Sequence, residues 1–126
     1  MNLTKSKIKK VNSLYIHIPF CSKICPYCDF VKIIDNEQFK KRYVDEIIKD
    51  ISFLTANEAK FLTIYIGGGT PSILNNEELI KLLSALKPLL KDNYEFTIEV
   101  NPESLTIEKL KIFKEYGVNR ISIGIQ

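Results

Sequence analysis

Short apolar runs typical of β-strands alternate along this chain with stretches typical of amphipathic helices. The strand-like runs, rich in β-branched and aromatic residues, cover residues 13–19, 61–69, 94–102 and 120–126. Apolar side chains recur with the period of a helix in residues 37–54, 75–90 and 106–117. Strands that alternate with helices form parallel sheets, because a parallel connection needs a long crossover. The sequence therefore predicts an α/β fold built from parallel βα units.

Capping residues support the ends of two of these helices. Asn75 or Asn76 can cap the start of the second helix, and Pro88 is expected to disturb its last turns. Thr106 is a candidate cap for the third helix, and Gly117 is placed to end it. The helix boundaries thus agree with the alternating pattern.

Polar and glycine-rich motifs follow each predicted strand. Three cysteines follow the first strand, the stretch from Gly67 to Ser72 follows the second, Glu99 and Asn101 end the third, and Gln126 lies in the fourth. In parallel α/β folds, binding sites lie at the carboxyl ends of the strands. We therefore expect these four motifs to meet in one pocket.

The cysteines Cys21, Cys25 and Cys28 are the only three in the chain and lie within eight positions. Three adjacent thiols cannot all pair within the chain, so a disulfide framework is not expected. A structural zinc site needs a fourth ligand. His17 is the only histidine, and its place on the preceding strand makes packing the favoured role. A 4Fe-4S cluster on three thiolates leaves one iron open to a small chelating molecule. The spacing favours the cluster over zinc.

Composition excludes several other classes of protein. The net charge is +3, and the lysines are scattered along the helices, so a nucleic-acid partner is not indicated. No apolar run reaches the roughly 20 residues of a membrane span, and no secretory signal is recognised. We expect a cytoplasmic protein with one domain, residues 13–126, preceded by a lysine-rich arm, residues 1–12.

Four motifs together resemble a known family. The stretches "YIHIPFCSKICPYCDF", "YIGGGTPSIL", "FTIEVNPESLT" and "GVNRISIGIQ" are similar, in order and approximate spacing, to those of the oxygen-independent coproporphyrinogen III oxidase group of radical S-adenosylmethionine (SAM) proteins. This group also includes heme chaperones. The resemblance implies the first part of a partial TIM-like barrel. It further implies that the chain is truncated, because it ends in the fourth predicted strand.

The resemblance also implies a set of ligand-binding residues. Cys21, Cys25 and Cys28 would bind the 4Fe-4S cluster, and the methionine part of SAM would chelate the open iron. The SAM site would be lined by residues from all four motifs, namely Tyr15, Tyr27, Gly68, Gly69, Thr70, Glu99 and Gln126. From the residues alone, the glycines are expected to offer close approach and amide groups to an anion. Glu99 could bind ribose hydroxyls or an ammonium group, although an exposed strand glutamate is the ordinary alternative.

Two features separate the branches of this family. The oxidases have a further cysteine two residues after the third, where this chain has Phe30, and they have a longer segment before the cluster motif. Both differences favour the heme chaperones, with heme or porphyrin, heme-acceptor proteins and an electron donor as partners. The oxidase itself, and a non-catalytic iron-sulfur remnant, remain the alternatives.

Overall fold

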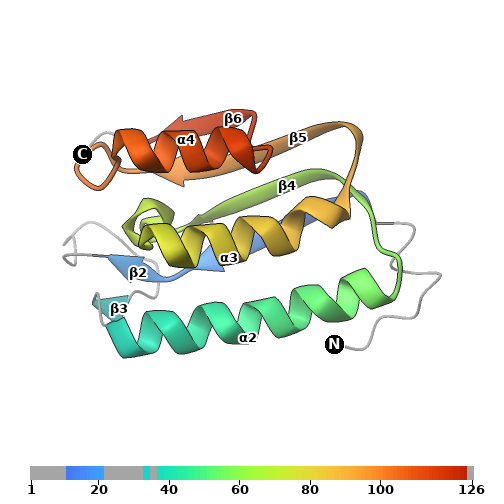
Figure 1. The fold of residues 1–126 in the computed structure, drawn as a ribbon, viewed down its shortest axis with the longest axis horizontal. Helices are drawn as coiled ribbons and strands as arrows, with labels where there is room; N and C mark the ends of the chain where they lie inside the picture. Colours follow the sequence, from blue (N-terminus) through green and yellow to red (C-terminus); the bar gives the residue numbers. More distant parts are fainter. Residues whose placement is uncertain (1–10, 22–32, 35–36, 125–126) are drawn as a thin grey trace.

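One parallel sheet organises the part of the chain described by the computed structural model, residues 11–21, 33–34 and 37–124 (Figure 1). Its strands are β1 (Ser13–Ile18), β4 (Phe61–Gly68), β5 (Leu90–Val100) and β6 (Arg120–Ile123). They lie in the order β1-β4-β5-β6, and every neighbouring pair is parallel. The predicted α/β class and all four predicted strands are confirmed.

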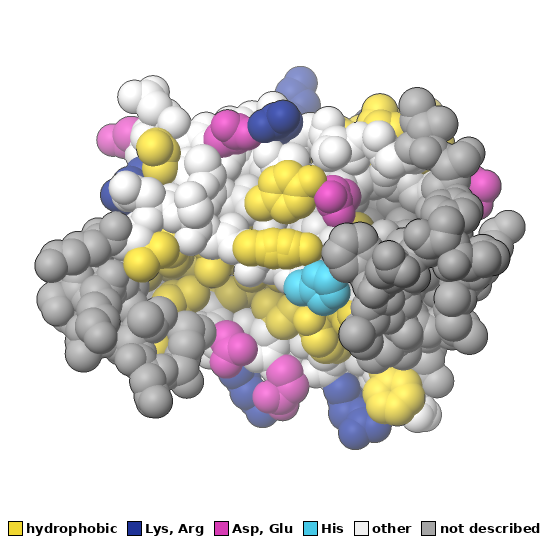
Figure 2. All heavy atoms as spheres, turned by 180° about the vertical axis from the view of Figure 1, so that it is seen from behind, with side chains coloured by type: hydrophobic (Ala, Val, Ile, Leu, Met, Phe, Trp, Pro, Cys, Tyr) yellow, Lys and Arg dark blue, Asp and Glu magenta, His cyan; other side chains and the backbone are white. Residues whose placement is uncertain are grey.

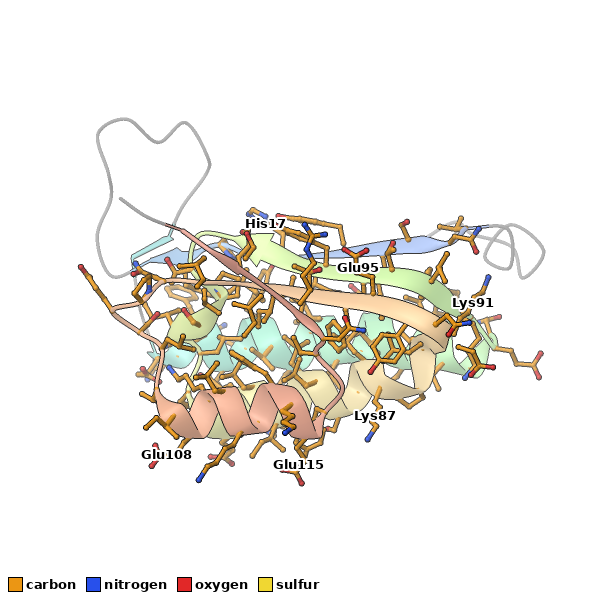
Figure 3. The ribbon with its side chains drawn as sticks, turned by 90° about the horizontal axis from the view of Figure 1, so that it is seen from above. His17, Lys87, Lys91, Glu95, Glu108 and Glu115 are labelled. Atoms are coloured by element: carbon orange, nitrogen blue, oxygen red, sulfur yellow. The ribbon has the colours of Figure 1, made fainter. Side chains whose placement is uncertain are left out.

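The three long helices cover one face of this sheet. They are α2 (Glu37–Ala56), α3 (Asn76–Leu86) and α4 (Ile107–Glu115). Figure 3 shows all three on the same side, with Glu108 and Glu115 of α4 on the outside of that layer, whereas His17 and Glu95 lie on the side of the sheet away from the helices. Among the described residues, no helix covers the opposite face of the sheet, which is called the uncovered face below.

The hydrophobic core lies between the sheet and the helices. Alternate strand residues such as Ile18, Ile66 and Ile98 are fully buried there, because successive strand side chains point to opposite faces. From the helix layer, Leu82, Leu83 and Phe113 of the same core are at most 1% exposed. The uncovered face instead carries the polar alternate positions, which include Tyr15, Glu99 and Ser122.

The helix ends follow their capping residues. Asn75 accepts a hydrogen bond from the Glu78 amide, and the Glu78 side chain accepts one from the Asn75 amide, which makes Asn75 the cap of α3. Thr106 caps α4 through a single bond, in which its hydroxyl oxygen accepts from the Lys109 amide. Gly117 follows α4 with φ +94°, a conformation that favours glycine.

Several boundaries differ from the sequence prediction. The second helix ends at Leu86, and a 3₁₀ turn, η2 (Lys87–Leu89), contains Pro88. The strand β5 begins at once after this turn, before the predicted residue 94. The early part was missed because Asp92 and Asn93 are exposed and polar, so no apolar alternation marks it. Asn93 also has φ +58°.

Two short strands and a 3₁₀ turn were not predicted. The strands β2 (Phe20–Cys21) and β3 (Ile33–Ile34) form a separate parallel pair, and η1 (Pro71–Ile73) follows β4. Two-residue strands are too short to give a periodic signal. In the described part of the chain, no helix is long and apolar enough to cross a membrane.

Candidate cofactor site

A pocket of about 170 Å³ lies at the carboxyl ends of β4, β5 and β6. Its lining comes from the last residues of β5 and β6 and from the segments that follow the three strands, namely Gly69, Thr70, Pro71, Glu99, Val100, Asn101, Ser122 and Gly124. Three of the predicted site residues, Gly69, Thr70 and Glu99, are therefore brought together. Pockets that enclose a whole small molecule usually have about 300–1,000 Å³, so this one has room for only part of such a ligand.

Glu99 is held firmly at the edge of this pocket. The Tyr65 hydroxyl donates a 2.6 Å hydrogen bond to Oε2 of Glu99, and the Gly68 amide donates a 2.9 Å hydrogen bond to Oε1. A carboxylate has about four lone-pair positions. These two bonds fix the orientation of Glu99 and leave acceptor capacity for a ligand ammonium or hydroxyl group.

The carboxylate of Glu99 also acts on two tyrosines. The hydrogen bond to Glu99 is the main cause that raises the pKa of Tyr65, with burial and the Glu99 charge adding to it and a hydrogen bond with Ser122 opposing it. Burial, followed by the charge of Glu99, raises the pKa of Tyr15. Both phenols therefore stay protonated, and able to donate hydrogen bonds, to a higher pH than an ordinary tyrosine.

Tyr15 belongs to an aromatic row on the uncovered face of the sheet. Its ring stacks on Tyr65 and on His17, with centroid separations of 5.9 Å in both cases. The Tyr15 hydroxyl lies 3.1 Å from Nδ1 of His17. Figure 2 shows the histidine near the middle of this face, with hydrophobic side chains beside it and an acidic side chain close by. Tyr15 is 51% exposed, so it is not a core residue.

The backbone of His17 is also anchored to the helix layer. The Tyr43 hydroxyl, from α2, donates a 2.5 Å hydrogen bond to the carbonyl oxygen of His17. The ring of Tyr43 packs edge-on against Phe20. The packing role predicted for His17 thus corresponds to two contacts. Its ring stacks on Tyr15, and its carbonyl oxygen accepts the hydrogen bond from Tyr43.

The two glycines at the end of β4 are required by close approach of neighbouring atoms. A Cβ atom on Gly68 would lie 2.5 Å from the Ile18 carbonyl oxygen, and Gly68 has φ +120°. A Cβ atom on Gly67 would lie 2.8 Å from Oε1 of Glu99. Side chains at these two positions would therefore displace the neighbouring strand or Glu99.

The expectation that this turn offers free amides to an anion needs correction. The Gly68 amide donates to Glu99, the Gly69 amide donates to the Ile18 carbonyl at 2.7 Å, and the Thr70 amide donates to the Phe20 carbonyl at 2.9 Å. All three donors are used to join β4 to neighbouring strands. The turn therefore lines the pocket and holds Glu99 in place through the Gly68 amide, but these three amides are not free to bind an anion.

The cysteine segment is anchored at its two ends. Phe20–Cys21 pairs with Ile33–Ile34, and the Thr70 amide bond connects Phe20 to the turn after β4. The backbone at Cys21 is therefore next to the pocket-lining turn. Other predicted residues, namely Cys25, Tyr27, Cys28, Phe30, Gln126 and the side chain of Cys21, lie outside the described residues.

Sequence reasoning missed Ser122, although a signal was present. Ser122 lies opposite Glu99 in the β5–β6 register and lines the pocket. In the run "RISIGIQ", the alternate positions are Arg120, Ser122, Gly124 and Gln126, and alternate positions share one face of a strand. This alternation would have assigned Ser122 to the same face as Gln126.

Comparison with known proteins shows the family to which this chain belongs. The sequence profile of the Radical SAM superfamily matches residues 15–126. This chain belongs to the Radical SAM superfamily. The match covers β1 from Tyr15 onward, the whole of β4, β5 and β6, and every motif that borders the pocket.

Several relatives within the superfamily carry the same name. The heme chaperone HemW of Lactococcus lactis is 45% identical over 121 residues, which are 94% of this chain and 31% of the relative. The heme chaperone HemW of Bacillus subtilis is 44% identical, over 92% of this chain and 32% of the relative. This radical SAM chain thus spans about a third of the length of the curated relatives that it matches.

A solved structure confirms the architecture. The radical SAM enzyme coproporphyrinogen III oxidase HemN from Escherichia coli superposes with a TM-score of 0.82 at 31% identity, covering 94% of this chain and 29% of that chain. The βα units described here therefore have the arrangement of a radical SAM fold, as the sequence predicted.

The groups around the pocket fit part of a SAM molecule. Glu99 supplies a carboxylate with acceptor capacity, while Ser122 and Asn101 supply groups that can pair with hydroxyl or amino groups. The small volume is compatible with a fragment of the ligand. The chemistry of these donors and acceptors thus agrees with the cofactor that the family name implies.

Proposed function

We propose that this protein binds a 4Fe-4S cluster through Cys21, Cys25 and Cys28 and binds SAM beside it. The observation that carries the proposal is the pocket at the carboxyl ends of β4, β5 and β6, which adjoins the anchored start of the cysteine segment. When bound, such a cluster supplies an iron with an open coordination position for the amino and carboxylate groups of SAM.

The protein's own residues then have separate roles in this proposal. Glu99, fixed by Tyr65 and Gly68, accepts hydrogen bonds from the cofactor. Gly69 and Thr70 line the pocket into which the cofactor would bind, and Tyr15 lies in the middle of the aromatic row on the uncovered face. Tyr27 and Gln126 are proposed as further SAM-binding residues from the motif resemblance. Residues 13–126 form the radical SAM core in this proposal, with residues 1–12 as an arm.

For the biological role, we propose heme binding and transfer to acceptor proteins. Two relatives of 44–45% identity are named heme chaperone HemW, and Phe30 replaces the additional cysteine expected of the oxidases. Closely spaced thiols that hold a cluster need a reducing compartment, so we place the protein in the cytoplasm.

A second candidate function is oxidation of coproporphyrinogen III. The likeness to the structure of HemN, at 31% identity, favours it. The lower identity and the residue at position 30 make it the weaker candidate. The two functions differ in whether porphyrinogen is consumed, so they can be separated experimentally.

The cluster is the first part of the proposal to test. We expect the chain, reconstituted without oxygen, to contain iron and sulfide in equal amounts and to give the paramagnetic resonance signal of a reduced 4Fe-4S cluster. Cys25→Ala should abolish the signal, whereas Ser84→Ala, an exposed substitution on α3, should leave it unchanged. Zinc without sulfide in the protein would contradict the proposal.

A further inference from the structure

The two loops that line the pocket are joined to each other by hydrogen bonds of Ser72, a residue that does not itself line the pocket. One loop follows β4 and contains Thr70 and Pro71, and the other follows β5 and contains Asn101. The Asn101 amide donates a 2.9 Å hydrogen bond to Oγ of Ser72, which lies next to Pro71 and is 0% exposed. The spacing of the loops is therefore not set by the sheet alone.

The hydroxyl groups of two serines extend this connection. Oγ of Ser72 and Oγ of Ser104 are 2.5 Å apart, and the Ser104 hydroxyl donates to the Asn101 carbonyl at 3.2 Å. Because Ser104 uses its one hydroxyl hydrogen for the Asn101 carbonyl, the bond between the two serines is consistent if Ser72 donates to Ser104. The second loop is thus tied to the first through both its backbone and its side chain.

A lysine from α4 spans the same two loops. Nζ of Lys109 donates to the Ser72 carbonyl at 2.6 Å and to the Ser104 carbonyl at 2.9 Å. Hydrogen bonds from a charged donor are shorter and stronger than those between neutral groups. The position of Lys109 is itself fixed, because its amide is bonded to the Thr106 cap of α4.

We infer that Lys109 is a positioning residue, which fixes the distance between the two pocket-lining loops from its place on α4. Lys109 does not line the pocket, so it acts through Ser72 and Ser104. That these loops matter for function rests on the proposed binding of SAM. The hydrogen bonds that connect the loops are independent of that proposal. Loss of Lys109 should loosen the loops without changing the sheet.

Burial of Lys109 agrees with this role. Burial lowers the pKa of Lys109, the nearby charge of Lys40 lowers it further, and Glu78 opposes the change. A fully exposed lysine would keep its hydration, whereas Lys109 is partly buried. The ammonium group therefore loses part of its hydration, and its hydrogen bonds to two carbonyl oxygens offset that cost.

Amide hydrogen exchange of the chain itself tests the connection without any cofactor. Lys109→Met keeps the length of the side chain and removes the donors. We expect the amides of Asn101, Ile73 and Leu74 to exchange about tenfold faster, with less than about a threefold change in the central β4–β5 ladder. If Lys109→Met does not fold, Lys109→Gln, whose shorter amide cannot span both carbonyls, carries the same test.

Two controls separate loop positioning from general stability. Lys111→Met removes an exposed lysine from the same helix and should change neither set of amides. Ile112→Val trims a core residue of α4 that is 8% exposed and should speed exchange throughout the sheet. Equal acceleration of ladder and loops in Lys109→Met, or no acceleration at all, would overturn the inference.

The affinity for SAM then tests the consequence for the site. In the cluster-loaded chain, Lys109→Met should weaken SAM binding by about tenfold or more, and Ile112→Val should leave it unchanged. Equal SAM affinity in the wild type and Lys109→Met would overturn the positioning role. If the wild type fails to bind SAM, the proposed function fails, and the exchange data alone decide whether Lys109 holds the loops together.

Discussion

The hydroxyl of Tyr65 and the carboxylate of Glu99, on the neighbouring strands β4 and β5, are joined by a 2.6 Å hydrogen bond. A tyrosine with a raised pKa stabilises the folded state fully below the unfolded pKa of about 10, and this contribution is lost as the pH rises through the folded value. We predict that the free energy of unfolding falls above pH ~10 and that Tyr65→Phe reduces this fall. Chemical denaturation over a pH series would measure both.

The same bond predicts a selective effect of Glu99. Glu99→Gln removes the carboxylate whose hydrogen bond and charge raise the pKa of Tyr65 and whose charge also raises the pKa of Tyr15, so these two tyrosines should titrate closer to their ordinary values in ultraviolet absorbance. Glu95→Gln is the matched control, because Glu95 is on the same strand and pairs with Arg120. An identical tyrosine titration in wild type and Glu99→Gln would show that Glu99 does not control Tyr65.

Gly68 is predicted to tolerate no side chain. Gly68→Ala would combine φ +120° with a contact of 2.5 Å to the Ile18 carbonyl, and we expect a loss of at least about 2 kcal/mol in the free energy of unfolding. Gly124→Ala is the control, since the nearest atom is 3.9 Å away. Urea denaturation decides the matter, and comparable stability of the two variants would refute the prediction.

Asn75 and Asn76 offer a direct test of helix capping. Asn75→Ala should lower the free energy of unfolding by about 1 kcal/mol, because it removes the acceptor of the Glu78 amide. Asn76→Ala, one position further along, should be nearly neutral, because alanine is favourable within a helix. Thermal unfolding followed by circular dichroism would distinguish them. A larger loss in Asn76→Ala would reverse the assignment.

The biological role can be tested in a protein of full length. Residues 1–126 would replace the matching segment of the Bacillus subtilis HemW, to which this chain is 44% identical. With reconstituted cluster, reductant and SAM, we expect the chimera to bind heme and transfer it to an acceptor protein. We expect no repeated conversion of coproporphyrinogen III.

The controls of this experiment concern Phe30 and the product. Formation of protoporphyrinogen IX over many turnovers, or a failure to bind heme, would contradict the heme-transfer role. Phe30→Cys in the same chimera should not create oxidase activity, because one thiol cannot supply the missing substrate contacts. Unmodified HemW provides the reference for heme binding.

Periodicity made the large elements of this fold predictable from the sequence. The four main strands and three helices have many residues each, and their apolar pattern repeats enough to be recognised. The pairs Phe20–Cys21 and Ile33–Ile34 are too short for that. The motif positions also predicted that Gly69, Thr70 and Glu99 would share a pocket, because parallel strands end at a common edge.

The detailed contacts of the site depend on information that one sequence lacks. The bond from Tyr65 to Glu99 requires the register between β4 and β5, which pairs Ile66 with Ile98. The use of the Gly69 amide by Ile18 depends on where β1 ends beside β4. The role of Lys109 needs the packing of α4 against two loops. Each of these is a tertiary relationship between distant segments.

The order of strands across the main sheet follows their order along the chain. During synthesis on a ribosome, each strand therefore finds its partner already made, and no strand of this sheet must wait for a later one to be inserted between its neighbours. Domains are generally made from the N-terminus onward, so β1 and β4 can pair before β5 and β6 emerge. The strand that leads into the cysteine segment thus gains its position early in vectorial folding.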